Sequence, residues 1–317
     1  MKLARAFESF VAEPVRYRSF ELALYRLSQL LHDRTNGNFD KLFMMIAPRV
    51  RPKISLPDYS DMNPSELQSI VATLQQDGYN ILPFVLPSRD INEIKSFAFS
   101  APAVGNKLDS QVYVKPDAIP LGSPRFTWSM PDLARLPAVQ RIILEGPYCA
   151  IAQEYLGCRP ALVHISLWMD VPCEERFEPY FYHYDNDGPR FLKFFVFLSD
   201  VTDGTGAHYF VAGSQSYSKP ASVARSGLYS DGEIFDAYSR HKELVTRGPA
   251  GTILAEDTKG FHRGSPITRG FRLLLQLEFA VIGYPTEQEL AQPFPAIPVV
   301  GLDSGLAAIT RKFYSPA

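Results

Sequence analysis

Two side chains that can bind a metal ion, His183 and Asp185, are separated by one residue in the sequence His-Tyr-Asp. In an extended segment, side chains two residues apart point to the same side. A single strand can therefore bring an imidazole and a carboxylate to one point. Two histidines and one carboxylate on one face of an Fe(II) ion leave its other positions open for reactants. The spacing thus supplies two of the three ligands of such an iron site.

The third ligand has to come from elsewhere in the chain, and His262 is the best candidate. It lies in the sequence Gly-Phe-His-Arg-Gly-Ser-Pro, shortly before the apolar segment that begins at Arg272. A histidine and an aspartate at this spacing also recur by chance. The order of the surrounding segments is therefore needed to support a metal site. The segments read as an apolar strand (191–198), a polar turn (199–206), a short strand (208–212) and a glycine-led strand (251–255).

This order of segments resembles the phytanoyl-CoA dioxygenase family of Fe(II)/2-oxoglutarate oxygenases. In that family the first histidine and aspartate are followed by a strand, a turn, a Gly-Ser pair, a distal histidine and an arginine. The matching motifs here are Leu198-Ser199-Asp200-Val201, Gly213-Ser214-Gln215, His262 and Arg272, with further matches at Asp77-Gly78-Tyr79 and Tyr155-Leu156-Gly157. The resemblance spans about the last three quarters of the chain. Gln215 departs from the family pattern, in which a histidine is common, but it lies outside the metal ligands.

The resemblance implies a function and a set of contacts. Fe(II) would bind His183, Asp185 and His262, and 2-oxoglutarate and O2 would take the remaining positions, with release of succinate and CO2. Asp185 favours hydroxylation, because related halogenases lack this carboxylate and bind halide instead; desaturation and ring formation stay open. Contacts to the co-substrate are expected from Arg272, Lys193 and Ser265, and contacts to the substrate from Arg125, Trp128 and Tyr184.

Arg272 begins a segment in which alternate residues form two faces, one with Arg272 and Gln276 and the other apolar. A guanidinium offers two parallel donors that match the geometry of a carboxylate. Arg272 is therefore expected to bind the far carboxylate of 2-oxoglutarate. Arg269 is the competing residue, but it lies in the turn Thr-Arg-Gly and is expected to be solvated.

Lys193 interrupts an otherwise apolar strand, and burying an unpaired ammonium group is costly. Either it pairs with a structural carboxylate, or it faces the cavity and binds an anion. Arg125 and Trp128 lie in a stretch, 101–130, that is rich in proline and glycine and shows no clear period. A surface cation and a packed indole are the alternatives to their predicted role at the site.

Two further histidines, His164 and His208, lie in predicted strands. A lone histidine in such a strand is more often a satisfied core residue than a ligand. His164 is therefore interpreted as a core histidine, and His208 as a core residue or a support for the metal ligands.

The resemblance also implies a mainly β fold with flanking helices, built on a double-stranded β-helix, the jelly-roll of cupin-like oxygenases. Residues 1–62 are predicted to form an N-terminal helical extension and linker, and residues 63–317 the oxygenase domain. The prolines at positions 48, 52 and 57 predict a loop or extended linker. Asn63 and Gly78 predict the two ends of a helix.

The composition is that of a soluble globular protein, with 317 residues, 46% hydrophobic and 21% charged. A formal net charge of -2 favours neither nucleic acid nor an anionic membrane as a partner. No apolar run is long enough to span a bilayer. Three cysteines without a Cys-x-x-Cys spacing favour free thiols in a reducing compartment, so a cytoplasmic protein is expected. The oligomeric state is left open, a homo-oligomer included.

Two other functions stay open on the sequence. A cupin-type metal enzyme could use the same ligands without 2-oxoglutarate, but it would not need Arg272. A catalytically silent, metal-stabilised binding protein would need neither a complete ligand set nor the arginine. The near-neutral charge and the aromatic residues near the site favour a small organic molecule as substrate, whose identity the sequence does not specify.

Overall fold

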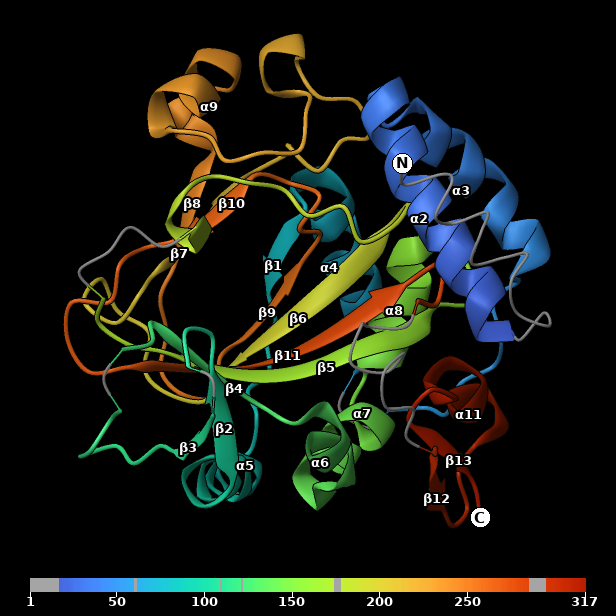
Figure 1. Ribbon diagram of the computed structural model, residues 1–317. Helices are drawn as coiled ribbons and strands as arrows, with labels where there is room; N and C mark the ends of the chain where they lie inside the picture. Colours follow the sequence, from blue (N-terminus) through green and yellow to red (C-terminus); the bar gives the residue numbers. More distant parts are fainter. Residues whose placement is uncertain (1–16, 60–61, 109, 121, 174–177, 285–294) are drawn as a thin grey trace.

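The structure, a computed structural model, describes residues 17–59, 62–108, 110–120, 122–173, 178–284 and 295–317. Its centre is a large sheet of eight strands with helices on one side and a smaller sheet on the other (Figure 1). The neighbouring strands of the large sheet pair antiparallel throughout. In spatial order they are β1 (Tyr79–Ile81), β9 (Ile253–Glu256), β6 (Phe191–Phe197), β11 (Arg272–Ala280), β5 (Ala161–Asp170), β4 (Arg125–Trp128), β2 (Pro102–Gly105) and β3 (Gln111–Tyr113).

The smaller sheet brings together segments that are far apart in the sequence. Its order is β10 (His262–Gly264), β7 (His208–Val211) and β8 (Glu243–Thr246). A separate parallel pair, β12 (Ile297–Val299) and β13 (Tyr314–Pro316), lies near the C-terminus. The mainly β architecture with flanking helices agrees with the fold class expected from the sequence.

Helices cover the face of the large sheet that is opposite to the smaller sheet. Helix α8 packs against β6 and β11, whereas α6 and α11 pack against β5. None of the described helices has the length and apolar character needed to cross a bilayer. The helices are α2 (Tyr17–Thr35), α3 (Asn38–Val50), α4 (Pro64–Asp77), α5 (Ser88–Ser100), α6 (Met130–Arg135), α7 (Pro137–Glu145), α8 (Tyr148–Leu156), α9 (Asp231–Ala237) and α11 (Ser304–Thr310).

Strand β11 shows how the sequence pattern sets the two faces of the sheet. Leu273, Leu275 and Leu277 point into the main hydrophobic core beneath the helices. Arg272 and Gln276 point the other way and line a pocket. The same alternation runs through β5 and β6, so one face of the sheet is a core and the other is a binding surface.

The ends of helix α4 agree with the sequence prediction. The Asn63 side-chain oxygen accepts a hydrogen bond from the Glu66 N–H at 2.9 Å, which satisfies one free donor of the first turn. Gly78 adopts φ 78°, a left-handed conformation that glycine reaches without a steric penalty.

Of the three prolines predicted to mark a loop or linker, Pro52 and Pro57 lie in irregular structure and Pro48 lies in a helix. Residues 38–50 form helix α3, which contains Pro48; the chain stays helical past the proline, and the Arg51 N–H still donates to the Ala47 carbonyl at 2.8 Å. A proline in the last turn removes only one helical hydrogen bond and does not prevent the helix. Residues 101–130 contain β2, β3 and β4, which are each three or four residues long and too short to show a period.

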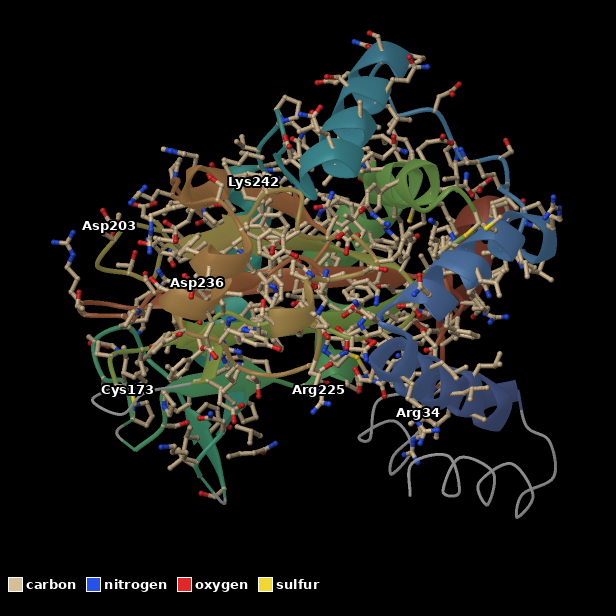
Figure 2. All side chains as sticks on the ribbon, turned by 90° about the horizontal axis from the view of Figure 1, so that it is seen from above. Arg34, Cys173, Asp203, Arg225, Asp236 and Lys242 are labelled. Atoms are coloured by element: carbon tan, nitrogen blue, oxygen red, sulfur yellow. The ribbon has the colours of Figure 1, made fainter. Side chains whose placement is uncertain are left out.

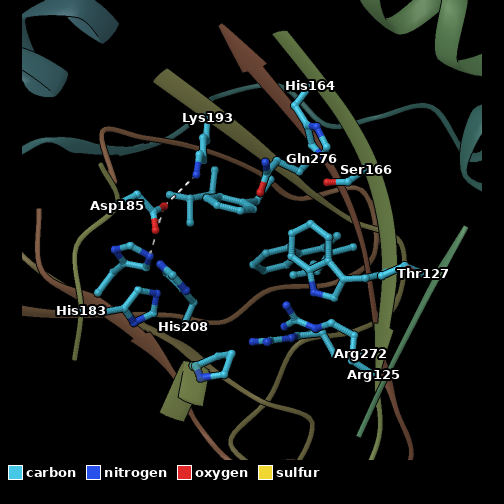
Figure 3. A pocket seen from close by; sticks show the side chains of 18 residues that line it. Arg125, Thr127, His164, Ser166, His183, Asp185, Lys193, His208, Arg272 and Gln276 are labelled. Carbon is cyan, nitrogen blue, oxygen red and sulfur yellow. Dashed lines mark hydrogen bonds and ion pairs between the residues drawn. The ribbon is translucent and has the colours of Figure 1, made fainter. Parts of the chain in front are cut away.

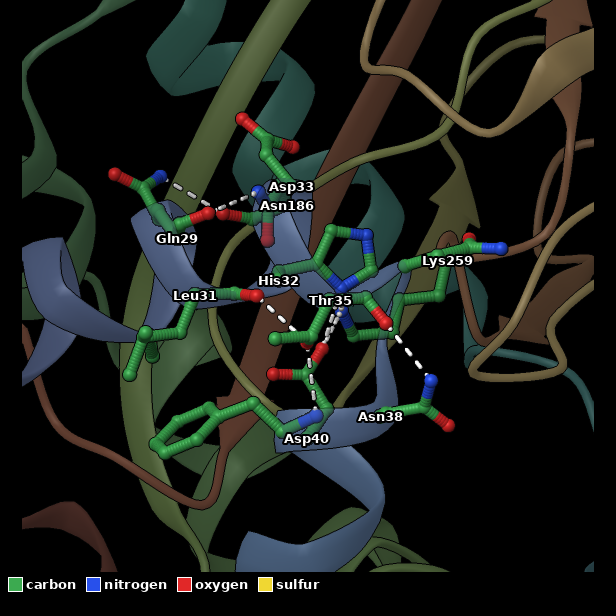
Figure 4. Close-up of polar contacts among 12 residues, drawn as sticks. Gln29, Leu31, His32, Asp33, Thr35, Asn38, Asp40, Asn186 and Lys259 are labelled. Atoms are coloured by element: carbon green, nitrogen blue, oxygen red, sulfur yellow. Dashed lines mark hydrogen bonds and ion pairs between the residues drawn. The ribbon is translucent and has the colours of Figure 1, made fainter. Parts of the chain in front are cut away.

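Helices α2 and α3 contact the segment that leads to His262 through a buried polar network (Figure 4). The Asp40 carboxylate accepts hydrogen bonds from Lys259 Nζ at 2.9 Å and lies 2.6 Å from His32 Nδ1. Asp40, His32 and Lys259 are each at most 1% exposed. Viewed from above, α2 and α3 lie on the opposite side of the molecule from Asp203 (Figure 2). The division at residue 62 stays a prediction.

Candidate metal centre and ligand pocket

A pocket of about 360 Å³ lies between the large and the small sheet. His183, Asp185 and His262 are on one side of it, and side chains from β4, β5 and β11 are on the other (Figure 3). Its charged and polar lining falls into three groups: the metal-binding side chains with Lys193 and His208, a pair of arginines, and a neutral polar group on β5 and β11.

The three predicted metal ligands meet at one point. One ligand atom from each of His183, Asp185 and His262 lies within 4.8 Å of the other two. The backbone sets this arrangement, because His183 and His262 pair as an antiparallel bridge with N–O distances of 3.0 and 2.9 Å. The Asp185 N–H donates to the Thr258 carbonyl at 2.8 Å. This bond ties the backbone of Asp185 to the segment that precedes His262.

Both imidazoles are oriented for metal binding by their own backbone. His183 Nδ1 lies 3.0 Å from the Phe181 carbonyl, and His262 Nδ1 lies 3.0 Å from the Gly260 carbonyl. A carbonyl can only accept, so each Nδ1 carries a proton, and in the neutral imidazole this places the lone pair on Nε2. This is the second contact that metal-binding histidines usually make. The donor set of two imidazole nitrogens and one carboxylate fits a non-haem Fe(II) ion.

The charges around the ligands favour the forms that bind a metal. Burial alone would raise the pKa of Asp185, but Lys193 and the two imidazoles hold it below its ordinary value. Burial and the neighbouring His183 lower the pKa of His262 to about 4. The carboxylate is therefore charged and His262 is neutral at pH 7, as ligation requires.

Lys193 is paired with carboxylates, the first of the two alternatives left by the sequence, and it also lines the pocket; binding of an anion by Lys193 stays a prediction. Its Nζ donates to Asp185 at 2.7 Å and to Asp187 at 2.8 Å, and lies 3.6 Å from Glu278. Burial alone would lower the pKa of Lys193, but these carboxylates raise it well above the ordinary value. The ammonium group stays charged and fixes the oxygen of Asp185 that it contacts.

We expect Lys193→Met to destabilise the protein by about 2 kcal/mol, because it leaves carboxylates in the sheet interior without their cation. The loss is below that for a fully buried pair, since Asp185 and Asp187 are 24% and 26% exposed. Urea unfolding of the metal-free protein measures it. Lys115→Met, at an exposed position, serves as the control and should change the free energy of unfolding by less than about 0.5 kcal/mol. Equal stability of both variants would contradict this role.

His208 lies beside the ligands rather than among them. Its Nε2 is 2.7 Å from the Glu256 carboxyl, and its ring centroid is 5.8 Å from that of His262. Burial raises the pKa of Glu256 to about 8, whereas burial and nearby Arg272 lower the pKa of His208 to about 3. The pair is therefore uncharged at pH 7, with the Glu256 carboxylic acid donating to the imidazole. His208 also lines the pocket, and a role in supporting the metal ligands stays a prediction.

The contribution of Glu256 to the free energy of unfolding should depend on pH, and a substitution of Glu256 can measure it. Between pH 6.5 and 8, folded Glu256 keeps a proton that the unfolded chain, with its ordinary pKa of 4.5, has lost. Folded His208 is neutral over this range, whereas in the unfolded chain it is half protonated at its ordinary pKa of 6.5. This second contribution is present with and without Glu256, so a comparison that changes only Glu256 separates the two. Since the native state binds the extra proton on Glu256, the contribution of Glu256 to stability falls as the pH rises.

We therefore expect the wild-type protein to lose stability relative to Glu256→Gln between pH 6.5 and 8. Glutamine keeps a donor toward His208 and removes the titrating group. Urea unfolding of both metal-free proteins at the two pH values measures the difference, and other titrating groups cancel in the comparison. Parallel changes in the two proteins would show that Glu256 is ionised in the native state throughout this range.

At another end of the pocket, Arg272 and Arg125 share one carboxylate. Arg272 donates to Asp170 Oδ2 at 2.7 Å, and Arg125 donates to Asp170 Oδ1 at 2.6 Å and Oδ2 at 3.1 Å. Trp168 Nε1 donates to the same carboxylate at 3.2 Å. Burial alone would raise the pKa of Asp170, but the two arginines lower it. Both guanidinium groups line the pocket and are held in place by this shared carboxylate.

Three of the predicted contact residues lie outside the pocket lining. Trp128 is buried in the main core, with Nε1 donating to the Ala101 carbonyl at 3.3 Å. Tyr184 is buried in a separate cluster, and its hydroxyl donates to the Ala224 carbonyl at 3.0 Å. Strand alternation is the reason, because Trp128 follows Thr127, and Tyr184 separates His183 from Asp185. Ser265 also lies outside, and its hydroxyl has no partner among the described residues.

The comparisons with known proteins come from structure alone: no protein-family model matches the chain, and no curated protein matches it in sequence. A crystal structure of SnoN, a non-heme alpha ketoglutarate dependent epimerase from nogalamycin biosynthesis, matches 76% of this chain and 94% of its own with a TM-score of 0.53 and 17% identity. The chain has the fold of SnoN.

SnoN is also matched in its complex with Fe3+, alpha ketoglutarate and nogalamycin RO, at a TM-score of 0.51 and 16% identity over 76% of this chain and 94% of SnoN. EctD from S. alaskensis in its apoform matches 74% of this chain and 88% of its own, with a TM-score of 0.50 and 18% identity. At these identities, the likeness to SnoN and EctD concerns the fold.

Sequence reasoning did not identify Asp170 and placed His164 in the core, yet both lie on the pocket side of β5. The signal was present as an alternation of polar residues along the strand, at His164, Ser166 and Asp170. Both faces of β5 are largely buried, so the alternation alone did not indicate which face was the core.

Proposed function

We propose that this protein is an Fe(II)/2-oxoglutarate-dependent dioxygenase of the phytanoyl-CoA dioxygenase-like family, which hydroxylates a small organic molecule. The observation that carries the proposal is the presence, in one pocket, of a His-Asp-His ligand set and of two arginines that contact the same aspartate. With Fe(II), 2-oxoglutarate and O2 bound, such a site supplies the oxidising power to hydroxylate a C–H bond, with release of succinate and CO2.

The residues of the pocket have separate roles in this proposal. His183, Asp185 and His262 would hold the metal, while Lys193 keeps Asp185 charged and oriented. Arg272, aided by Arg125, would bind the far carboxylate of 2-oxoglutarate. The Nε–H of Arg272 is buried without a partner among the described residues, so it is available as a donor. Phe195, Phe197 and Leu254 line the pocket and would exclude water from the reacting atoms.

The finer family assignment rests on the motif order in the sequence. The arrangement of a large and a small sheet around one pocket supports a double-stranded β-helix, in which rigid strands hold the ligands. SnoN, whose fold this chain shares, was crystallised with Fe3+ and alpha ketoglutarate. Free Cys149, Cys158 and Cys173 support a reducing compartment such as the cytoplasm.

An assay of succinate formation tests the proposal. The protein is incubated with Fe(II), 2-oxoglutarate, O2 and pools of small metabolites, and succinate is measured together with oxygenated product. We expect at least one pool to raise succinate formation with an equal amount of product. A metal-dependent reaction that proceeds without 2-oxoglutarate would favour the cupin-type enzyme instead. The absence of any metal-dependent turnover would favour the binding protein.

A further inference from the structure

A row of three neutral polar side chains lines the pocket across from the metal ligands. His164 and Ser166 come from β5, and Gln276 comes from β11 (Figure 3). Ser166 and Gln276 are direct partners in the register of the two strands, and His164 is two residues from Ser166 on the same face. The three groups therefore form one continuous patch, named here the neutral row.

The neutral row differs from the other polar groups of the pocket because its hydrogen-bonding capacity is unused. Within the described residues, none of the three side chains makes a hydrogen bond. By contrast, both arginines are bound to Asp170, Lys193 is bound to Asp185 and Asp187, and His208 is bound to Glu256. All three are half-buried and line the cavity, so their donors and acceptors are open to a ligand.

The row carries no charge at pH 7. Burial, with the nearby cations Lys312 and Lys193, lowers the pKa of His164 to about 4, so its imidazole is neutral. A neutral imidazole offers one donor and one acceptor, and the amide and hydroxyl offer both. Two opposite charges beside the row offset each other, because Lys193 lies 3.6 Å from Glu278, the register partner of His164. A charged ligand group here would lose its hydration without gaining a counter-ion.

Apolar surface flanks the row on two sides. Trp168 is two residues beyond Ser166 on the same face of β5, and Phe195 is the register partner of Gln276 on β6. Their rings meet edge to face, with centroids 6.1 Å apart. The surface thus combines an aromatic wall with neutral donors and acceptors, the usual composition of a small-molecule site.

We propose that the neutral row is the recognition site for the primary substrate, and that this substrate is a compact, uncharged molecule with an amide or hydroxyl group beside an apolar ring or chain. The inference rests on the proposed function, since it assigns the arginine end to the co-substrate and the neutral row to the molecule that is oxidised. Binding there would place the rest of the substrate between the row and the metal ligands.

Four five-membered-ring probes test the charge preference: 2-pyrrolidinone, cyclopentanol, cyclopentanecarboxylate and pyrrolidinium. Binding of all four probes to the full chain is measured by saturation-transfer NMR with Zn(II) and 2-oxoglutarate present, so that the metal ligands and the two arginines of the same pocket are occupied. The two uncharged probes are also measured without Zn(II) and 2-oxoglutarate. We expect transfer to the two uncharged probes and little to the two ions. Gln276→Leu, of similar volume, should weaken binding of 2-pyrrolidinone about tenfold. Ser166→Ala should weaken it less, and Gln75→Leu on the exposed face of α4 should have no effect.

Tighter binding of either ion, absence of binding by both uncharged probes, or equal binding to wild type and both pocket variants would overturn the inference. Affinity for 2-oxoglutarate is measured on the same proteins. If Gln276→Leu and Ser166→Ala lose 2-oxoglutarate, the row belongs to the co-substrate and the inference fails while the proposed function stands. If uncharged probes bind the wild type but neither metal nor 2-oxoglutarate does, the proposed function fails and the subsite stands.

Discussion

His183→Ala and His262→Ala each weaken Fe(II) binding by about 100-fold or more, because each removes one of three ligands from the site. Loss of a group that only orients a ligand typically costs 10- to 100-fold in metal affinity, and loss of a ligand itself costs more. An anaerobic Fe(II) titration, followed by calorimetry, measures the affinity. The expectation follows from the geometry, in which both Nε2 atoms are free and one atom of each ligand lies within 4.8 Å of the others.

The control for this prediction is His241→Ala, which removes an exposed histidine of the same chain. Its Fe(II) affinity should equal that of the wild type. Because His262 is only 7% exposed, the alanine variant can also disturb packing. His183→Gln and Asp185→Asn, which keep the side-chain volume, are therefore measured together with the circular dichroism of each protein. Folded variants that bind Fe(II) with unchanged stoichiometry and affinity would eliminate this metal site.

Arg272→Ala should weaken 2-oxoglutarate binding about 30-fold or more and leave Fe(II) binding nearly unchanged. Losing one partner of a desolvated charge pair costs about 2–5 kcal/mol, and about 1.4 kcal/mol corresponds to a factor of ten. Arg272 is 5% exposed and is held by Asp170 and the Gly206 carbonyl, so its guanidinium is preorganised. Trp168 lines the same pocket and reports binding by its fluorescence.

Arg269→Ala is the matched control, because this arginine is exposed in the turn before β11, as the sequence predicted. It should bind 2-oxoglutarate as the wild type does. Arg272→Lys, which keeps the charge but not the two parallel donors, should fall between alanine and wild type. If Arg269→Ala weakens 2-oxoglutarate binding and Arg272→Ala does not, the carboxylate site lies in the turn. If all three variants bind 2-oxoglutarate as the wild type does, the proposed function is wrong and the cupin-type enzyme without 2-oxoglutarate is favoured.

The fold elements that the sequence predicted are those with a long or sharply bounded pattern. Strands β5, β6 and β11 are seven to ten residues long, and helix α4 has a capping residue at one end and a glycine at the other. Helix α3 and strands β2–β4 were missed because their local signals are weak or misleading. Pro48 suggested a loop, and a strand of three or four residues has no measurable period. Those elements form because neighbouring segments supply their hydrogen bonds and their core contacts.

The sequence by itself determined which side chains could share a face. The one-residue spacing of His183 and Asp185, and the alternation that begins at Arg272, follow from the period of an extended chain. The same rule places Tyr184 on the opposite side from His183 and Asp185, and Tyr184 does lie outside the pocket lining.

Only the tertiary structure decided which face became the pocket and which distant groups meet there. Strands β5 and β11 are buried on both sides, so their patterns do not distinguish a core face from a ligand face. The meeting of Arg125 and Arg272 at Asp170, and the pairing of Ser166 with Gln276, depend on strand order within the sheet. That order is set by the packing of segments that can lie more than a hundred residues apart, for example Arg272 and Asp170 with a separation of 102. Local sequence spacing carries no information on such pairings.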